Sequence, residues 1–136
     1  MPMTDREFLE NLTKRWISLW TCPVDWPLFD ALHADNFQDL AAAGRPATKE
    51  GFAAGLKAMT EAFPDLKTVA DDLIIDVGRQ TVAVRWTSRG TNARFFLGIG
   101  PTGKLTELRG IEIIEVRDGK ITRRWGEWDT SAHTGR

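Results

Sequence analysis

The hydrophobic pattern of the chain changes its period near Pro64, and this change decides which class of fold the sequence can adopt. Before Pro64, apolar residues such as Phe8, Leu12 and Trp16 recur at the spacing of an amphipathic helix. After Pro64, apolar and polar residues alternate as they do along β-strands. A chain that places its helices first and its alternating strands afterwards is expected to form an α+β domain with an antiparallel sheet.

Three helices are expected in the first half of the chain, each begun by a side chain that can cap the first turn. They are a helix over about residues 4–20 opened by the Thr4 and Glu7 capping box, a short helix capped by Asp25 that runs through Leu32, and a helix capped by Thr48 that Pro64 ends. His33 is expected to be a solvated C-terminal cap of the second helix. Residues 37–47 are predicted to form a short strand and a turn.

Four long strands are predicted after Pro64, over residues 67–77, 80–91, 105–116 and 120–129. Asp118 and Gly119 predict a type I′ hairpin turn between the last two. The third of these strands carries apolar residues on both faces, with Ile111 and Ile113 on one face and Ile114 and Val116 on the other. The helices can cover one face, and a second copy of the chain is the simplest cover for the other. The sequence therefore predicts a homodimer that packs sheet to sheet.

Composition limits the classes of function. The chain has 136 residues, 18 Lys and Arg against 19 Asp and Glu, two histidines and one cysteine. A net charge of -1 argues against a nucleic-acid partner or an anionic membrane partner. We expect one domain over residues 1–136, with a core at about 4–129, a flexible tail at 130–136, and no metal or cofactor. With no basic leader and no apolar run of roughly 20 residues, a cytoplasmic location is expected.

Several segments resemble a known family when they are taken together. They are AFPDL at 62–66, VAVRWTSRGT at 82–91, FLGIGPTGK at 96–104, RGIEIIEVRDGKI at 109–121 and WGEWD at 125–129. They resemble the SnoaL-like polyketide cyclases, often labelled ester cyclases, and the similarity extends over about residues 4–129. The resemblance implies the cone-shaped α+β fold of the nuclear transport factor 2-like and ketosteroid isomerase-like proteins. In that fold a curved sheet wraps around helices and encloses an apolar cavity, and members are usually dimers or higher oligomers through the outer sheet face.

The resemblance also implies a reaction, an intramolecular aldol closure of a polyketide ester without a metal or cofactor. An aspartate in the last strand serves as acid and base, helped by a histidine in the preceding strand and an asparagine after the second helix. Aligned on DGKI, these three positions hold Gly126, Glu112 and Gln38. Because Gly126 has no side chain to remove a proton, that mechanism does not transfer to this chain as it stands.

Glu112 is the carboxylate that can replace the missing acid, since it shares the expected cavity face with Leu108 and Ile114. It is interpreted either as a catalyst whose pKa burial raises, with Gln38 as its hydrogen-bond partner, or as a carboxylate satisfied by an internal arginine. The predicted ligand-binding residues are Trp86, Trp128, Asp39, Leu108 and Ile114.

Two functions stay open at this point. One is a cofactor-independent cyclase, isomerase or hydrolase acting on a small apolar carbonyl compound by acid–base chemistry. The other is a non-catalytic dimer that binds a small hydrophobic ligand and has lost the family's aspartate. An isomerase of the ketosteroid type is disfavoured, because the chain has no Tyr to supply a phenol donor.

Overall fold

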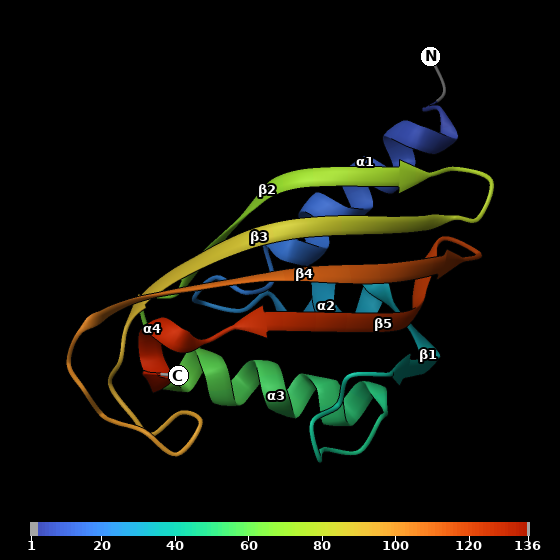
Figure 1. The fold of residues 1–136 in the computed structure, drawn as a ribbon. Helices are drawn as coiled ribbons and strands as arrows, with labels where there is room; N and C mark the ends of the chain where they lie inside the picture. Colours follow the sequence, from blue (N-terminus) through green and yellow to red (C-terminus); the bar gives the residue numbers. More distant parts are fainter. Residues whose placement is uncertain (1–2, 136) are drawn as a thin grey trace.

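A curved five-stranded sheet forms one wall of the protein, and helices α1 and α2 lie behind it (Figure 1). A computed structural model describes residues 3–135. The strands run in the order β1-β5-β4-β3-β2, so the first strand lies beside the last. The elements are α1 Asp5–Ile17, α2 Trp26–Leu32, β1 His33–Asp39, α3 Lys49–Ala62, β2 Lys67–Asp76, β3 Thr81–Thr91, β4 Leu105–Arg117, β5 Lys120–Asp129 and α4 Ser131–Thr134. The α+β prediction is confirmed.

The three predicted helices form, and each begins at the expected cap. Thr4 and Glu7 exchange the two hydrogen bonds of a capping box at the start of α1. Asp25 caps α2 and Thr48 caps α3 in the same way. The first helix ends at Ile17 rather than at residue 20, because the backbone N–H groups of Leu19 and Trp20 bond to carbonyls only three residues back and tighten the chain into a turn.

The four predicted strands appear as β2 to β5 with bounds that differ by about one residue. β4 and β5 join through Asp118 and Gly119, whose φ angles of 52° and 76° suit the predicted type I′ turn. The two faces of β4 differ as predicted, since Ile114 and Val116 are fully buried while Ile111 is 51% exposed. The inner face of the sheet therefore carries the core, and the outer face is left uncovered in the single chain.

β1 is the element that the sequence describes least well. It begins at His33 rather than at residue 37, and it pairs in parallel with β5. His33 does cap α2, but the prediction of a solvated side chain is wrong, because its imidazole is fully buried. Trp16 Nε1 lies 3.0 Å from His33 Nε2, and His33 Nδ1 lies 2.7 Å from the carbonyl oxygen of Phe29. These contacts hold the start of β1 beneath α1.

The C-terminal segment that was expected to be flexible contains the short helix α4, while residue 136 lies outside the described residues. His133 anchors this helix, since its Nε2 lies 2.7 Å from the carbonyl oxygen of Phe96 and its ring packs on Phe63 and Phe96. Across residues 3–135, no helix combines the length and the apolar character that crossing a bilayer would require. α4 and the loop between β3 and β4 lie at the same end of the sheet (Figure 1).

Candidate functional site

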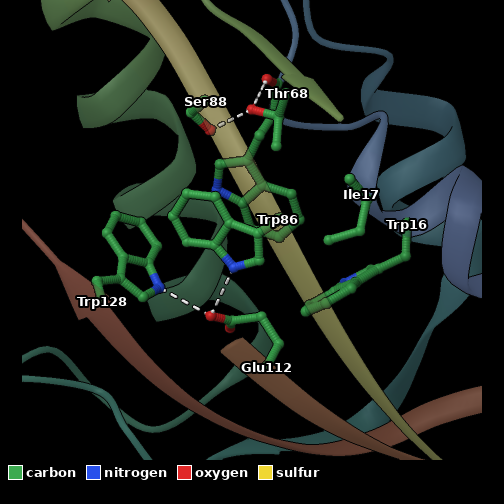
Figure 2. A pocket seen from close by; sticks show the side chains of 8 residues that line it. Trp16, Ile17, Thr68, Trp86, Ser88, Glu112 and Trp128 are labelled. Carbon is green, nitrogen blue, oxygen red and sulfur yellow. Dashed lines mark hydrogen bonds between the residues drawn. The ribbon is translucent and has the colours of Figure 1, made fainter. Parts of the chain in front are cut away.

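Glu112 lies at the centre of a buried polar cluster on the inner face of the sheet. It projects from β4 directly opposite Gly126 of β5, and it is 3% exposed. Its Oε1 accepts a hydrogen bond from Arg124 Nε at 2.6 Å. Its Oε2 accepts from the indole N–H groups of Trp128 at 2.8 Å and Trp86 at 3.1 Å (Figure 2). Both oxygens of this carboxylate are therefore engaged by N–H donors.

The cluster continues from Glu112 through two arginines and a second carboxylate. Arg124 Nη1 donates to Asp39 Oδ1 at 2.9 Å and to the carbonyl oxygen of Ala41 at 3.3 Å. Asp39 Oδ2 accepts from Arg45 Nη2 at 3.2 Å. Asp39 comes from the end of β1, so the parallel pairing of β1 with β5 is what brings it to Arg124. Negative and positive side chains thus alternate through the site, in the order Glu112, Arg124, Asp39 and Arg45.

Burial and pairing act in opposite directions on the ionisation of this cluster. Burial raises the pKa of Glu112, while Arg124 and the two indole N–H groups favour its charged form. Burial also disfavours the charged form of Arg124, but Glu112 and Asp39 outweigh that effect and leave the pKa of Arg124 raised. Arg124 is therefore a permanent cation held between two carboxylates.

Two glycines on neighbouring strands make room for the cluster. A Cβ atom on Gly126 would lie 2.5 Å from Glu112 Oε1 and 2.6 Å from Oε2, and it would also collide with Arg124 Nη2. A Cβ atom on Gly110 would lie 2.5 Å from Cζ2 of Trp86. The absence of side chains at these two positions is what allows the carboxylate and the indole ring to lie flat against the sheet.

The larger of two cavities on the inner side has a volume of about 320 Å³ and lies between α3, the end of β5 and the loop between β3 and β4. That volume is within the range of sites that bind small molecules. Its lining residues are Trp20, Ala41, Ala43, Arg45, Phe52, Gly55, Leu56, Met59, Phe96, Leu97, Arg124, Gly126, Trp128 and Thr130. Arg45 and Arg124 thus border this cavity, while the two carboxylates that they bind lie behind them. Phe96 and Leu97 belong to FLGIGPTGK, one of the segments that carry the family resemblance.

A second, much smaller cavity lies on the other side of Trp128. Its volume is about 10 Å³, which leaves room for roughly one water molecule. Trp16, Trp86, Trp128 and Glu112 surround it, together with the hydroxyl groups of Thr68 and Ser88 (Figure 2). Trp86 and Trp128 meet edge to face with ring centroids 5.0 Å apart. Trp20 and Trp128 line both cavities and so separate them.

Some of the residues selected from the sequence meet in this cluster and others do not. Glu112, Trp86, Trp128 and Asp39 come together. Leu108 and Ile114 are 1% and 0% exposed in the core, and neither lines the two cavities. Gln38 forms no hydrogen bond with Glu112, since strand alternation turns it outward and gives the inner position to Asp39.

Arg124 and Arg45 were not selected as site residues, although an internal arginine was one of the two interpretations of Glu112. The available signal was strand alternation, which turns Arg123 and Arg124 to opposite faces of β5. Within residues 3–135, no group of three or more His, Cys, Asp or Glu side chains is arranged so that it could hold a metal ion. The polar chemistry of the described site is that of carboxylates, guanidinium groups and indole N–H donors.

A curved, unclosed sheet that wraps around helices and leaves an inner cavity with a polar end is the architecture of the nuclear transport factor 2-like class. The family model described as SnoaL-like polyketide cyclase matches residues 10–134. The chain therefore belongs to the SnoaL-like polyketide cyclase family, as the five sequence segments indicated.

Solved structures agree with this assignment at the level of the fold. TsrD from Streptomyces laurentii superposes with a TM-score of 0.82 at 21% identity, covering 93% of this chain and 92% of that one. IdmH from Streptomyces antibioticus gives 0.78 at 24% identity, with 93% and 96% covered. A SnoaL-like polyketide cyclase from Agrobacterium tumefaciens gives 0.67 at 20% identity, with 96% and 95% covered. A search of curated protein sequences found no match.

Proposed function

We propose that the chain binds a small, mostly apolar carbonyl compound in the 320 Å³ cavity and acts on it by acid–base chemistry without a cofactor. The observation that carries this proposal is the position of the Glu112 carboxylate. Its two oxygens lie 2.5 and 2.6 Å from the point where a side chain on Gly126 would begin. A carboxylate from β4 thus occupies the region that the resemblance assigns to an aspartate on β5.

The surroundings of Glu112 suit a base. Burial raises its pKa, and a carboxylate with a raised pKa removes a proton from carbon more readily at neutral pH. Arg124 borders the cavity beside Gly126 and can donate a hydrogen bond to the oxygen on which negative charge develops when an enolate forms. In this proposal the Glu112 carboxylate, which lies just behind the cavity wall, turns toward the ligand to accept the proton from the carbon next to the carbonyl group, and Arg124 stabilises the enolate.

A second candidate function is ligand binding without catalysis. It is favoured by the three N–H donors that already engage both oxygens of Glu112. Removing a proton from a ligand would require the carboxylate to give up at least part of these hydrogen bonds. In this alternative, Glu112 and Arg124 shape the end of the cavity, and the cavity binds a ligand without acting on it.

Deuterium exchange separates the two candidates without a known substrate. The probe is 2-tetralone, an apolar bicyclic ketone with acidic protons next to its carbonyl group, incubated in D₂O and followed by NMR. The acid–base proposal expects exchange above the buffer rate, and it expects Glu112→Gln to abolish the acceleration while retaining binding. Glu107→Gln is the matched control, because Glu107 lies on the same strand but faces outward and pairs with Arg89.

Binding of 2-tetralone by the wild-type chain without accelerated exchange would favour the non-catalytic alternative. Accelerated exchange that persists in Glu112→Gln would reject Glu112 as the base. The absence of any binding would reject both candidates for this cavity.

The proposal includes a homodimer in the cytoplasm. Its support is the row of apolar side chains that the single chain leaves exposed on the outer sheet face, where Ile111, Ile113 and Trp125 are 51%, 40% and 37% exposed. Exposed apolar clusters of this kind commonly mark protein contacts. Sedimentation of the purified chain tests the dimer, and imaging of a fluorescently tagged chain in its own cell tests the location.

A further inference from the structure

The polar end of the 320 Å³ cavity has more hydrogen-bond donors than acceptors. The carboxylate oxygens of Glu112 and Asp39 already accept five N–H groups between them from Arg124, Arg45, Trp86 and Trp128. Arg124 uses its Nε and Nη1 atoms for these bonds, and its Nη2 has no partner within residues 3–135. Arg45 uses only Nη2, and its Nε is buried without a partner. A molecule that enters here meets unused guanidinium donors.

The positions of the four charged side chains relative to the cavity make its wall positive. The four charged groups sum to zero, but Arg45 and Arg124 line the cavity whereas Asp39 and Glu112 lie behind them. Because electrostatic energy falls with distance, a group inside the cavity interacts more strongly with the two cations than with the anions behind. The carboxylates of Asp39 and Glu112 do not line this cavity, so the two arginines are the charged groups that a ligand meets first.

The absence of an acidic side chain at Gly126 adds to the positive charge at this end of the cavity. The resemblance assigns an acidic side chain to this position, and such a side chain would stand between Arg124 Nη2 and the cavity. With glycine there, Nη2 lies against the bare backbone of β5 at the cavity wall. The end of the cavity therefore presents a cation where the resemblance implies an anion.

The rest of the cavity wall is apolar and rich in flat side chains. Trp20, Phe52, Phe96 and Trp128 line it together with Leu56 and Met59 of α3. Phe52 also lies beneath the guanidinium of Arg124, whose Cζ is 5.2 Å from the ring centroid. This stacking holds the guanidinium plane in place. A planar hydrocarbon body fits such walls, with its polar end toward the two arginines.

We propose that the natural ligand of this cavity is an apolar, planar molecule that carries a carboxylate, and that the carboxylate binds Arg124 Nη2 together with the guanidinium of Arg45. This inference rests on the proposed ligand cavity and narrows its ligand to one chemical class. Hydrogen bonds between a guanidinium and a carboxylate are about twice as strong as those between neutral groups. The charged end would thus supply both affinity and orientation.

Calorimetry with a matched pair of probes tests the proposal. The probes are 2-naphthoate and 2-acetylnaphthalene, which share the same ring system and differ in whether the polar end is a carboxylate or a neutral ketone. We expect 2-naphthoate to bind at least about tenfold more tightly, a difference of about 1.4 kcal/mol. Arg45→Met, which keeps the length of the side chain and removes its charge, is expected to remove most of that preference.

The choice of Arg45 keeps the experiment interpretable, because its side chain is 35% exposed and its loss leaves Asp39 still bound to Arg124. Arg109→Met is the matched control, since Arg109 is exposed and pairs with Asp129 rather than with the cluster. It is expected to leave both affinities unchanged.

Three outcomes would overturn the inference. Equal affinities for the two probes, or tighter binding of the ketone, would show that the cavity does not select a carboxylate, while the proposed function would still stand. A preference for 2-naphthoate that survives in Arg45→Met would place the carboxylate elsewhere. If neither probe binds, this inference and the proposed ligand cavity are rejected together.

Discussion

Glu112 and Gly126 face each other across β4 and β5, and the carboxylate of Glu112 fills the space that any side chain on Gly126 would need. The two residues therefore depend on each other. The carboxylate can lie flat on the sheet only because the opposite residue is glycine. This relationship explains in physical terms why this chain holds no acid at position 126, and it leads to the first prediction.

Gly126→Ala is expected to lower the free energy of unfolding by about 1–3 kcal/mol, the usual cost of forcing an extra methyl group into a packed site. The new Cβ would displace Glu112 from Arg124. Urea unfolding measures the change. Gly78→Ala is the control, because a Cβ there meets nothing closer than an Asp76 oxygen at 3.6 Å. Equal stability of the two variants would contradict the packing that the structure describes.

Arg124→Met is expected to cost about 3–5 kcal/mol in unfolding free energy, because it leaves two buried carboxylates without their shared cation. Arg123→Met is the matched control on the same strand, since the Arg123 side chain is 49% exposed and a change of less than about 0.5 kcal/mol is expected there.

A double variant distinguishes the two possible causes of this loss of stability, the broken ion pair and the lost packing of the Arg124 side chain. Adding Glu112→Gln to Arg124→Met removes one of the stranded charges and should recover part of the stability. A double variant less stable than Arg124→Met alone would argue that packing around Arg124, rather than charge, accounts for the loss.

His33 is expected to make the protein sensitive to mild acid. Burial lowers the pKa of His33 to about 4, against an ordinary value of 6.5. The unfolded chain therefore takes up a proton at this residue before the folded chain does, and the stability that His33 contributes is lost as the pH falls from 6.5 toward 4. The full loss amounts to about 3 kcal/mol.

The hydrogen bond from Trp16 to His33 also disfavours the protonated form of His33. Its Nε2 lies 3.0 Å from Trp16 Nε1, so a proton on Nε2 would break that contact. His33→Gln keeps a hydrogen-bonding side chain that does not titrate. Urea unfolding at pH 7 and pH 5 should show a smaller loss of stability in this variant than in the wild type. An identical pH dependence in both would rule out His33 as the cause.

Ile113→Arg is expected to convert the proposed dimer into monomers, because it places a charge at the centre of the exposed outer face of β4. Analytical ultracentrifugation measures the change in mass. Phe8→Arg is the control, since Phe8 is 41% exposed on α1 rather than on the sheet. A wild-type chain that already sediments as a monomer would reject the dimer.

The sequence predicts the elements of this fold well where their signals are local. The caps at Thr4, Asp25 and Thr48 and the turn at Asp118 depend on residues within a few positions, and all four form as expected. The alternating faces of β3 and β4 follow from the pleat of a strand in the same way. The burial of Glu112 on the inner face was therefore predictable.

The partners of Glu112 were harder to predict, because they depend on how distant segments pair. Asp39 reaches Arg124 only because β1 lies parallel to β5. That pairing has no signature in the residues of β1 themselves. His33 was misjudged for the same reason, since its burial comes from the helices that pack over it.

The parallel pairing of β1 with β5 has a consequence for how the site comes into being. Asp39 and Arg124 are 85 positions apart, and contacts between such distant segments require most of the chain to be ordered first. During synthesis, β1 can pair with β5 only after β5 has emerged from the ribosome. The proposed ligand site is therefore complete only in the finished chain, and an intermediate that lacks β5 would not form it.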